Sequence, residues 1–365
     1  MMVEASELSA EHIRKANLIQ VLLEDAEAAE QPVTEPPDMA AVEWSEEKIR
    51  SYFKQSQAHS CLTIPAATCT GLTALDMNST SRSFKSPKAI DVDTWFPGLQ
   101  RSNFTCPHPR MIAVCFHNAG SAADMFTGEG TGVRKAASPL LDWCRKNGAE
   151  CLAVQLPGRG MRSKEPFLTS AQEAAQQLLP IIASRLAQTP YIVIAHSMGA
   201  WVAFEFLCHA HSMGLPMPCK VFISAMPHPA IPFKERPWKQ QATLNERELQ
   251  EECKQWDVSP ALFSPALWPV YHSIMRADFK MFDQYQFTHE GEAPFAFPLS
   301  TFYGSKDTRV TAEMVKGWQS FTTGPFSCTP IEGNHLWPLD KHAKVVWLQA
   351  IVHELDTMSS PASQD

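Results

Sequence analysis

The sequence predicts an α/β fold, with a mostly parallel central sheet covered by helices on both faces. Two observations lead to this prediction. From about residue 95 onward, short segments that are apolar almost throughout alternate with longer helix-like segments. Strands without a polar face are typical of a parallel sheet that is buried on both sides, and the helices between them supply the cover. Such sheets place reactive groups in the loops at the carboxyl ends of their strands.

Short length and apolar content identify the predicted strands. They are MIAVCF (111–116), CLAVQL (151–156), YIVIA (191–195), KVFISA (220–225), LSTFYG (299–304) and FSCTPI (326–331). Helices are expected at 138–147, 170–187, 200–213, 311–323 and 339–356. Residues 226–298 interrupt the alternation because they contain only helix-compatible sequence. An insertion of this length at the strand ends is well placed to form a lid over a site.

Residues 1–92 differ in composition from the rest of the chain. Residues 1–50 contain twelve acidic and four basic residues and include two helix-compatible stretches. Residues 54–90 are rich in Ser, Thr, Ala and Lys without a sustained period, which indicates a linker. We therefore expect an acidic, partly helical extension over 1–92, an α/β domain over 93–358 and a disordered tail over 359–365. An extension that docks a partner, one that covers the body and one that is poorly ordered all remain open.

Composition excludes several classes of protein. The net charge of −8 comes from the first fifty residues, and a body without a basic face is a poor nucleic-acid binder. The sequence contains no run of 18 apolar residues, so no membrane-spanning helix is predicted. The N-terminus lacks a secretory signal pattern. The ten cysteines form no CxxC pair and no Cys/His set at metal-ligand spacing, so we expect reduced thiols and no metal site. These features predict a cytoplasmic monomer, with a plastid location left open.

The pentapeptide AHSMG occurs twice, at 195–199 and at 210–214. The first copy lies between a predicted strand and an apolar helix, which is the setting in which a G-x-S-x-G-type turn raises a nucleophilic serine above the sheet edge. The second copy lies at the end of that helix, where Gly214 precedes Leu215 and Pro216 in a helix-stop pattern. Ser197 is therefore the predicted nucleophile, and Ser212 a surface residue.

A serine hydroxyl needs a histidine base that is oriented by a carboxylate. Hydrolases with this turn supply them in the chain order Ser, acid, His. Asp307 follows one predicted strand and His335 follows the next, so both belong to loops at the same sheet edge. The other candidate acids, Asp278, Asp283 and Asp340, lie in the insertion or at the start of the last helix. His196, although beside the nucleophile, is predicted to point away from it and to be structural.

The oxyanion of a tetrahedral intermediate needs backbone N–H donors. Met198 follows the predicted nucleophile and should supply one of them. The loop FHNAGSA after the first strand should supply the other, from Asn118 or Ala119. His117 lies in the same loop and cannot be dismissed from the site on sequence grounds.

Five stretches, taken in order, resemble one family, the type II thioesterases, which are stand-alone enzymes with the α/β-hydrolase fold. The sequence around Trp95 with FHNAGSA is similar to that family's opening strand and F-P-x-A-G-G loop, although His117 and Ser121 replace its Pro and second Gly. VQLPGRGMR (154–162) is similar to its Q-L-P-G-R-G-x-R signature, the most specific match. AHSMGA, GSKD and GNHLW resemble its serine, acid and histidine loops, and MRADF (275–279) resembles part of its lid helices.

The resemblance covers about 95–356 and implies a serine thioesterase without a cofactor. Its substrate would be an acyl group on the phosphopantetheine arm of an acyl carrier protein, in polyketide, nonribosomal peptide or fatty-acid synthesis. The apolar residues Phe263, Trp268, Phe279 and Phe282 would shape the acyl pocket, although plain helix packing accounts for them equally well. Arg159 is interpreted as a turn residue rather than a substrate contact. An esterase or acyl-CoA hydrolase with the same triad, and a non-catalytic protein acting through its acidic helices, are the alternatives.

Overall fold

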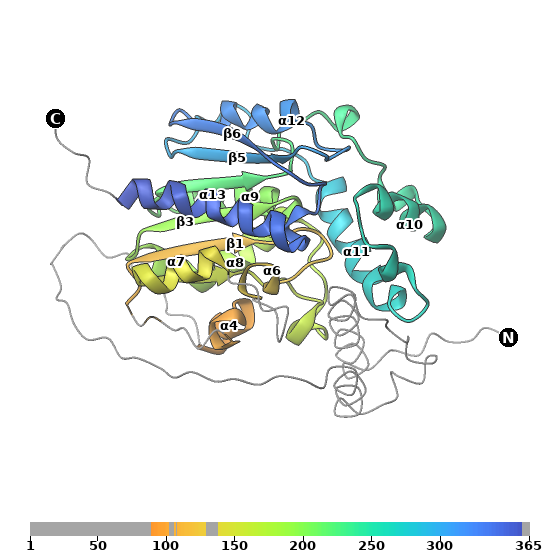
Figure 1. Cartoon of the computed structure of the whole chain (residues 1–365), viewed down its shortest axis with the longest axis horizontal. Coiled ribbons are helices and arrows are strands. Elements are labelled where there is room, and N and C mark those ends of the chain that lie inside the picture. The colour runs from red at the N-terminus through yellow and green to blue at the C-terminus, as the bar shows by residue number, and fades with distance from the viewer. Residues whose placement is uncertain (1–88, 102–105, 107, 129–137, 360–365) are drawn as a thin grey trace. The chain divides into compact units, whose positions relative to one another are not determined.

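The computed structural model describes residues 89–101, 106, 108–128 and 138–359 (Figure 1). Its centre is a six-stranded parallel sheet with the strand order β2-β1-β3-β4-β5-β6. The strands are β1 (Met111–Phe116), β2 (Ala149–Ala153), β3 (Tyr191–His196), β4 (Lys220–Ser224), β5 (Leu299–Gly304) and β6 (Phe326–Ile331). All six predicted strands are thus present, and the predicted parallel α/β fold is confirmed.

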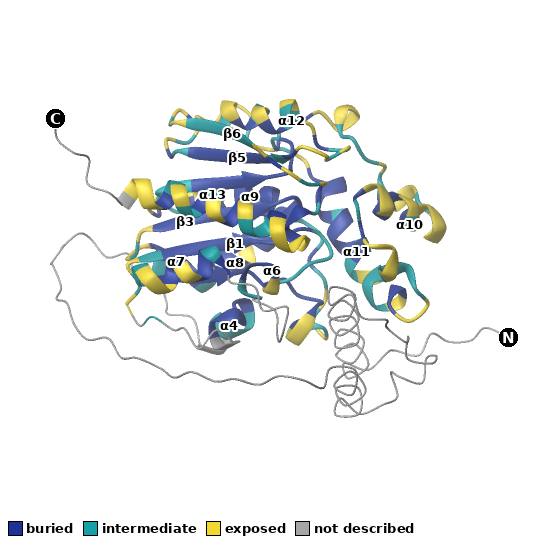
Figure 2. Cartoon of the chain, viewed as in Figure 1, coloured by how far each residue is buried: buried dark blue, intermediate teal, exposed yellow. Residues whose placement is uncertain are grey.

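Helices cover both faces of the sheet. On one face, α7 (Pro139–Asn147) and α13 (Lys341–Ser359) pack against each other, and α13 places Trp347 and Ile351 in a core shared with the strands. On the other face, α8 (Ala171–Leu186) packs against α9 (Met198–Ser212), which also contacts β1 and β3. Figure 2 shows that β1, β3 and β5 are mostly buried, whereas β6, at the edge of the sheet, is mostly intermediate. Burial on both faces explains why β1 is apolar throughout and β3 is apolar up to Ala195.

The helix starts follow from local sequence. The Ser138 side chain accepts a hydrogen bond from Leu141 N–H at the start of α7, and Ser170 accepts one from Glu173 N–H at the start of α8. Each of these bonds satisfies a donor that the helix itself cannot pair. Gly148 ends α7 in the left-handed conformation, at φ 64°, which glycine adopts without a steric penalty.

The start of the described fold differs from the sequence prediction. The opening strand predicted around Trp95 is wrong, because Trp95 is the last residue of the helix α4 (Ala89–Trp95). This helix also crosses the predicted boundary between residues 92 and 93, whose position stays a prediction. The helical stretches and linker predicted before residue 89, and the tail from 360 onward, lie outside the described residues.

The insertion, residues 226–298, joins β4 to β5 and is only partly helical. Its regular elements are η3 (Phe233–Glu235), η4 (Gln241–Thr243), α10 (Glu246–Gln255), η5 (Pro260–Phe263) and α11 (Trp268–Asp283). Residues 284–298 contain no helix, so the prediction of helix-compatible sequence throughout is wrong there. The predicted helix 311–323 is α12 (Ala312–Lys316) followed by a 3-10 turn, η6 (Gly317–Phe321). In the part of the chain that the structure describes, no helix is both long and apolar enough to cross a membrane.

Candidate active site

The turn between β3 and α9 presents Ser197 in a strained conformation. Its φ of 52° and ψ of −129° are rare for a residue with a side chain, and such strain is typical of a nucleophile turn. Ser197 N–H donates to Ser224 O of β4 at 2.8 Å, which ties the turn to the neighbouring strand. Two residues later, a Cβ on Gly199 would lie 2.5 Å from Phe116 O, so only glycine fits this contact.

Three side chains from separate loops form one hydrogen-bonded chain. The Ser197 hydroxyl shares a hydrogen bond of 2.8 Å with His335 Nε2. His335 Nδ1 lies 2.8 Å from Asp307 Oδ2, as an N–H donor to a carboxylate would. Ser197 follows β3, Asp307 follows β5 and His335 follows β6, so the carboxyl ends of three strands bring them together. The structure therefore places the three residues predicted to act together within hydrogen-bond distance.

Asp307 is held as an acceptor for the histidine. Burial opposes ionisation, but the hydrogen bond and charge of His335 outweigh it and lower the carboxyl pKa from its ordinary value. The backbone N–H groups of Arg309 and Val310 donate to Asp307 Oδ1 at 2.8 and 3.0 Å and favour the ionised form further. An ionised carboxylate at this position fixes the His335 tautomer whose Nε2 faces Ser197.

The insertion supports His335 from a second side. The Asp257 carboxylate accepts a hydrogen bond of 3.0 Å from the His335 backbone N–H. The Trp256 ring meets the His335 ring edge to face, with centroids 4.6 Å apart. The sequence analysis did not identify either residue. Nothing in a Trp-Asp pair just after a helix predicts contact with a loop 78 residues further along the chain.

The predicted oxyanion donors lie either in the pocket with Ser197 or next to it in the chain. Asn118 and Ala119 line the same pocket as Ser197, and Met198 begins α9. Among the described hydrogen bonds, the backbone N–H groups of Ala119 and Met198 have no protein acceptor. Gly120 N–H, by contrast, donates to Asp278 Oδ2 at 2.8 Å and is not available. This pattern favours the donors predicted from sequence, whose assignment stays a prediction.

A buried ion pair holds the loop that carries Asn118 and Ala119. Arg159 makes two hydrogen bonds to the Asp278 carboxylate, at 2.6 and 2.7 Å, and both side chains are buried. Arg159 also donates to Ser121 O at 3.0 Å, on the same loop as Gly120. The pair thus joins the 154–162 segment, the loop after β1 and helix α11. This arrangement supports the interpretation of Arg159 as structural, and it gives Asp278 a role that sequence reasoning did not find.

The two remaining histidines near Ser197 are buried. His196 packs against Trp337 with ring centroids 4.8 Å apart, and its Nε2 lies 3.0 Å from His335 O. Its predicted structural position is consistent with these contacts. Burial, reinforced by the positive charge of Arg159, lowers the pKa of His117 to about 4. A ring that is neutral at pH 7 and whose Nδ1 lies 2.8 Å from Asn118 O helps to shape the loop.

An apolar pocket with an empty volume of about 350 Å³ opens beside Ser197 and His335. Its walls come mainly from the insertion and the loops around it. The lining residues are Asn118, Ala119, Ser197, Met226, Trp256, Val258, Met275, Phe279, Phe282, His335 and Leu336.

The four predicted pocket residues fall into two pairs. Phe279 and Phe282, on α11, line the pocket. Phe263 and Trp268 are not among the lining residues; their rings pack on each other with centroids 5.3 Å apart, and Trp268 Nε1 donates to Glu246. We therefore correct the assignment of Phe263 and Trp268, which hold the outer part of the insertion together in this structure.

The sequence model of the thioesterase domain family matches residues 112–353, which include Ser197, Asp307 and His335. The chain belongs to the thioesterase family. It is a hydrolase of the kind that acts on thioesters. The matched residues run from β1 into α13 and include all six strands.

Relatives of this thioesterase come from biosynthetic systems. GrsT, a gramicidin S biosynthesis protein of Aneurinibacillus migulanus, is 26% identical over 209 residues, covering 55% of this chain and 78% of GrsT. The medium-chain S-acyl fatty acid synthase thioesterase of Homo sapiens is 24% identical over 196 residues, covering 52% of this chain and 71% of that protein. The solved structure of BorB, the type II thioesterase from the borrelidin biosynthetic cluster, matches at TM-score 0.54 and 25% identity, over 68% of this chain and 92% of BorB. The predicted type II thioesterase family is confirmed.

Proposed function

We propose that this thioesterase hydrolyses acyl groups from the phosphopantetheine thioester of acyl carrier proteins, with Ser197 as nucleophile, His335 as base and Asp307 as orienting acid. The observation that carries the proposal is the hydrogen-bonded chain of these three side chains at the opening of an apolar pocket. The biosynthetic relatives support the choice of carrier-bound substrates, because GrsT belongs to gramicidin S biosynthesis and BorB to the borrelidin cluster.

The first half of the reaction transfers the acyl group to the enzyme. His335 Nε2 takes the Ser197 proton as Oγ attacks the thioester carbonyl, and Asp307 stabilises the imidazolium that forms. The carbonyl oxygen becomes an oxyanion, which accepts hydrogen bonds from Met198 N–H and from an N–H of Asn118 or Ala119. The C–S bond then breaks, and His335 returns the proton to the departing pantetheine thiol.

The second half frees the acid by the same groups. A water molecule loses a proton to His335 as its oxygen attacks the acyl-serine carbonyl, and the same N–H donors stabilise the second oxyanion. Collapse releases the carboxylic acid and restores the Ser197 hydroxyl. Throughout, the apolar chain would lie against Phe279, Phe282 and Met275, whose rings and thioether suit a flexible hydrocarbon.

The test compares hydrolysis of one acyl group presented on a carrier protein, on coenzyme A and as a p-nitrophenyl ester. We expect the highest kcat/KM with the carrier protein, and loss of all three activities in Ser197→Ala. Equal or higher kcat/KM with the simple ester, abolished by Ser197→Ala, would keep the catalytic assignment and overturn the carrier assignment. Full activity in Ser197→Ala would overturn the catalytic assignment itself.

A further inference from the structure

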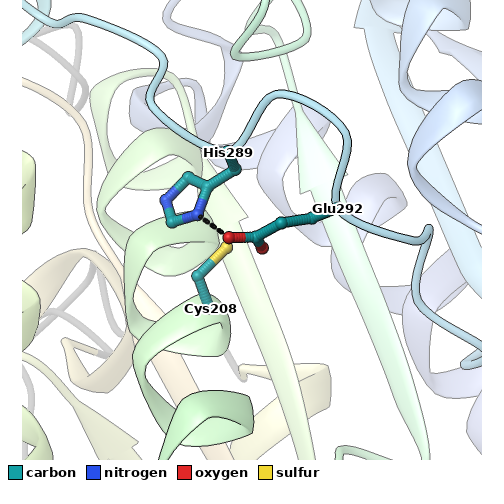
Figure 3. Close-up of side chains that lie close together, drawn as sticks. All are labelled: Cys208, His289 and Glu292. Carbon is teal, nitrogen blue, oxygen red and sulfur yellow. Dashed lines mark hydrogen bonds and ion pairs between the residues drawn. The ribbon is translucent and has the colours of Figure 1, made fainter.

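A second cluster of reactive side chains lies outside the pocket, where the last turns of α9 meet the segment that follows α11. Cys208 on α9 and His289 and Glu292 on that segment point toward one another (Figure 3). The cysteine sulfur, a histidine nitrogen and a glutamate oxygen all lie within 4.8 Å of one another. None of the three lines the pocket beside Ser197. The proposed thioesterase reaction makes no use of them.

The histidine of this cluster is oriented by a buried carboxylate. His289 Nε2 lies 3.2 Å from Glu205 Oε2, and Glu205 is only 5% exposed. Tyr285 O–H donates to Glu205 Oε1 at 2.6 Å, and Gln172 Nε2 donates to the same oxygen at 3.1 Å. A histidine that binds a metal through one nitrogen usually donates its other N–H to a carboxylate fixed in this way. The arrangement leaves His289 Nδ1 to face Glu292 and Cys208.

The charges of the cluster are unbalanced. Within the described residues, the ion pairs of Glu205 and of Glu292 are made to His289, and neither carboxylate pairs with a lysine or arginine. Two carboxylates therefore share one imidazole beside a buried thiol. A divalent cation would neutralise this excess of negative charge.

The donor types select the cation. A thiolate, an imidazole and a carboxylate are all ligands of Zn²⁺, whereas Mg²⁺ and Ca²⁺ prefer oxygen atoms alone.

We propose that Cys208 Sγ, His289 Nδ1 and Glu292 bind a zinc ion, with Glu205 orienting the histidine. Binding releases the thiol proton and any proton on Nδ1. The Glu292 side chain is 59% exposed, so solvent can supply the fourth ligand. The ion joins α9, the helix that begins beside Ser197, to the non-helical end of the insertion. Its effect is to stabilise that end of the insertion against the body.

The test uses the full-length protein, purified, stripped with a chelator and reloaded with one equivalent of Zn²⁺ or Co²⁺. We expect one tightly held zinc per chain, a higher Tm than the stripped protein, and a thiolate-to-cobalt charge-transfer band. Loss of a residue that hydrogen-bonds a metal ligand typically weakens metal binding about 10- to 100-fold. Glu292→Gln removes a proposed ligand itself, so it should weaken zinc binding by at least that much. Glu290→Gln removes a neighbouring exposed carboxylate and is the matched control, which should bind zinc as the wild type does.

Two further variants separate the proposal from unspecific binding. Cys208→Ser should abolish the thiolate-to-cobalt band, whereas Cys328→Ser, which changes a thiol outside the cluster, should keep it. Glu205→Gln should lower zinc affinity about 10- to 100-fold while leaving the band. Less than half an equivalent of retained zinc, or equal zinc affinity in Glu292→Gln and Glu290→Gln, would overturn the proposal. A thiolate-to-cobalt band that persists in Cys208→Ser would do the same.

Discussion

The two copies of AHSMG begin and end the same helix, yet they adopt different structures. In the first copy, β3 ends at His196, α9 starts at Met198, and Ser197 between them has a φ of 52°. In the second copy, Ser212 is the last residue of α9 and Gly214 follows with a φ of 70°. Five identical residues thus form a strand-to-helix turn in one place and a helix end in the other.

Surroundings account for the difference. In the first copy, Ala195 and His196 are fully buried, and Ser197 is held by its N–H bond to Ser224. In the second copy, Ser212 is exposed and its hydroxyl only donates to His209 O one turn earlier. The strained turn exists because strands and loops on both sides fix it, whereas the helix end needs only local hydrogen bonds. Matched substitutions in the two copies can test this contrast.

The largest expected difference is between Ser197→Ala and Ser212→Ala. Loss of a nucleophilic serine leaves only the contribution of binding and of the oxyanion donors, so Ser197→Ala should lower kcat by about 10⁴-fold or more. Ser212→Ala removes one hydrogen bond at an exposed helix end, so kcat should change less than about twofold and stability by about 0.5 kcal/mol or less. Steady-state hydrolysis of an acyl thioester and urea unfolding measure both. Similar losses of kcat in the two variants would contradict the assignment.

The first copy also depends on the distant pair Arg159 and Asp278, which holds the loop facing Ser197. Asp278→Asn leaves the Arg159 charge buried without its partner, which typically costs about 3–5 kcal/mol. It also loosens the Gly120 N–H contact, so kcat should fall together with stability. Urea unfolding at pH 8 and initial rates measure the two effects.

Asp283→Asn, on the same helix, is the matched control. Burial raises the pKa of Asp283 to about 7, so its folded form binds more protons than the unfolded chain between pH 4 and 7. Stability therefore falls as pH rises through that window. Above pH 7 the folded protein bears the full free-energy cost of burying the ionised carboxylate. The neutral amide should leave stability at pH 8 unchanged or raise it. Equal destabilisation by the two Asn variants would show that the ion pair of Asp278 has no special role.

Sequence reasoning reached the sheet and its edge but not the insertion. The strands β1, β5 and β6 match their predicted bounds. Once the strands are placed, a parallel sheet brings the loops after β3, β5 and β6 to one edge, which is how Ser197, Asp307 and His335 meet.

The missed contacts all need tertiary information. Arg159 and Asp278 are 119 residues apart, and each alone resembles an ordinary turn or helix residue. Asp257 has a φ of 62°. The sequence does not predict this left-handed conformation for a residue with a side chain. Cys208 and the His289–Glu292 pair are separated by eighty residues, so spacing rules for metal ligands do not detect them. In the insertion, an apolar residue can face either the pocket, as Phe279 does, or another ring, as Phe263 does.

A smaller effect is expected from alanine at the two glycines that end the copies. A Cβ on Gly199 would lie 2.5 and 2.6 Å from Phe116 O and His117 O, so the loop after β1 must shift. Such overpacking typically costs about 1–3 kcal/mol, and kcat should fall because this loop carries the predicted oxyanion donors. Gly214→Ala forces a positive φ on alanine at a cost of about 1 kcal/mol, with kcat unchanged. If Gly214→Ala lowered kcat as far as Gly199→Ala, the two glycines would not differ as described.

The smallest expected effect is on the pH dependence of stability. Substitution of His196 should change this dependence, and substitution of His211 should not. Burial lowers the pKa of His196 well below its usual value, with the charge of His335 adding to it. The folded state then binds fewer protons than the unfolded chain below pH 6.5, so the stability that neutral His196 supplies is present above that pH and is lost as pH falls. The slope from one such group is at most about 1.4 kcal/mol per pH unit.

His196→Asn should therefore be destabilised at pH 7.5, because its ring packing is lost, and its deficit relative to the wild type should shrink toward pH 5.5. His211→Asn, at an exposed position, should run parallel to the wild type over the same range. Urea unfolding at pH 7.5, 6.5 and 5.5 measures these curves, and a deficit of His196→Asn that stays constant with pH would show that the first copy does not hold a neutral, buried histidine.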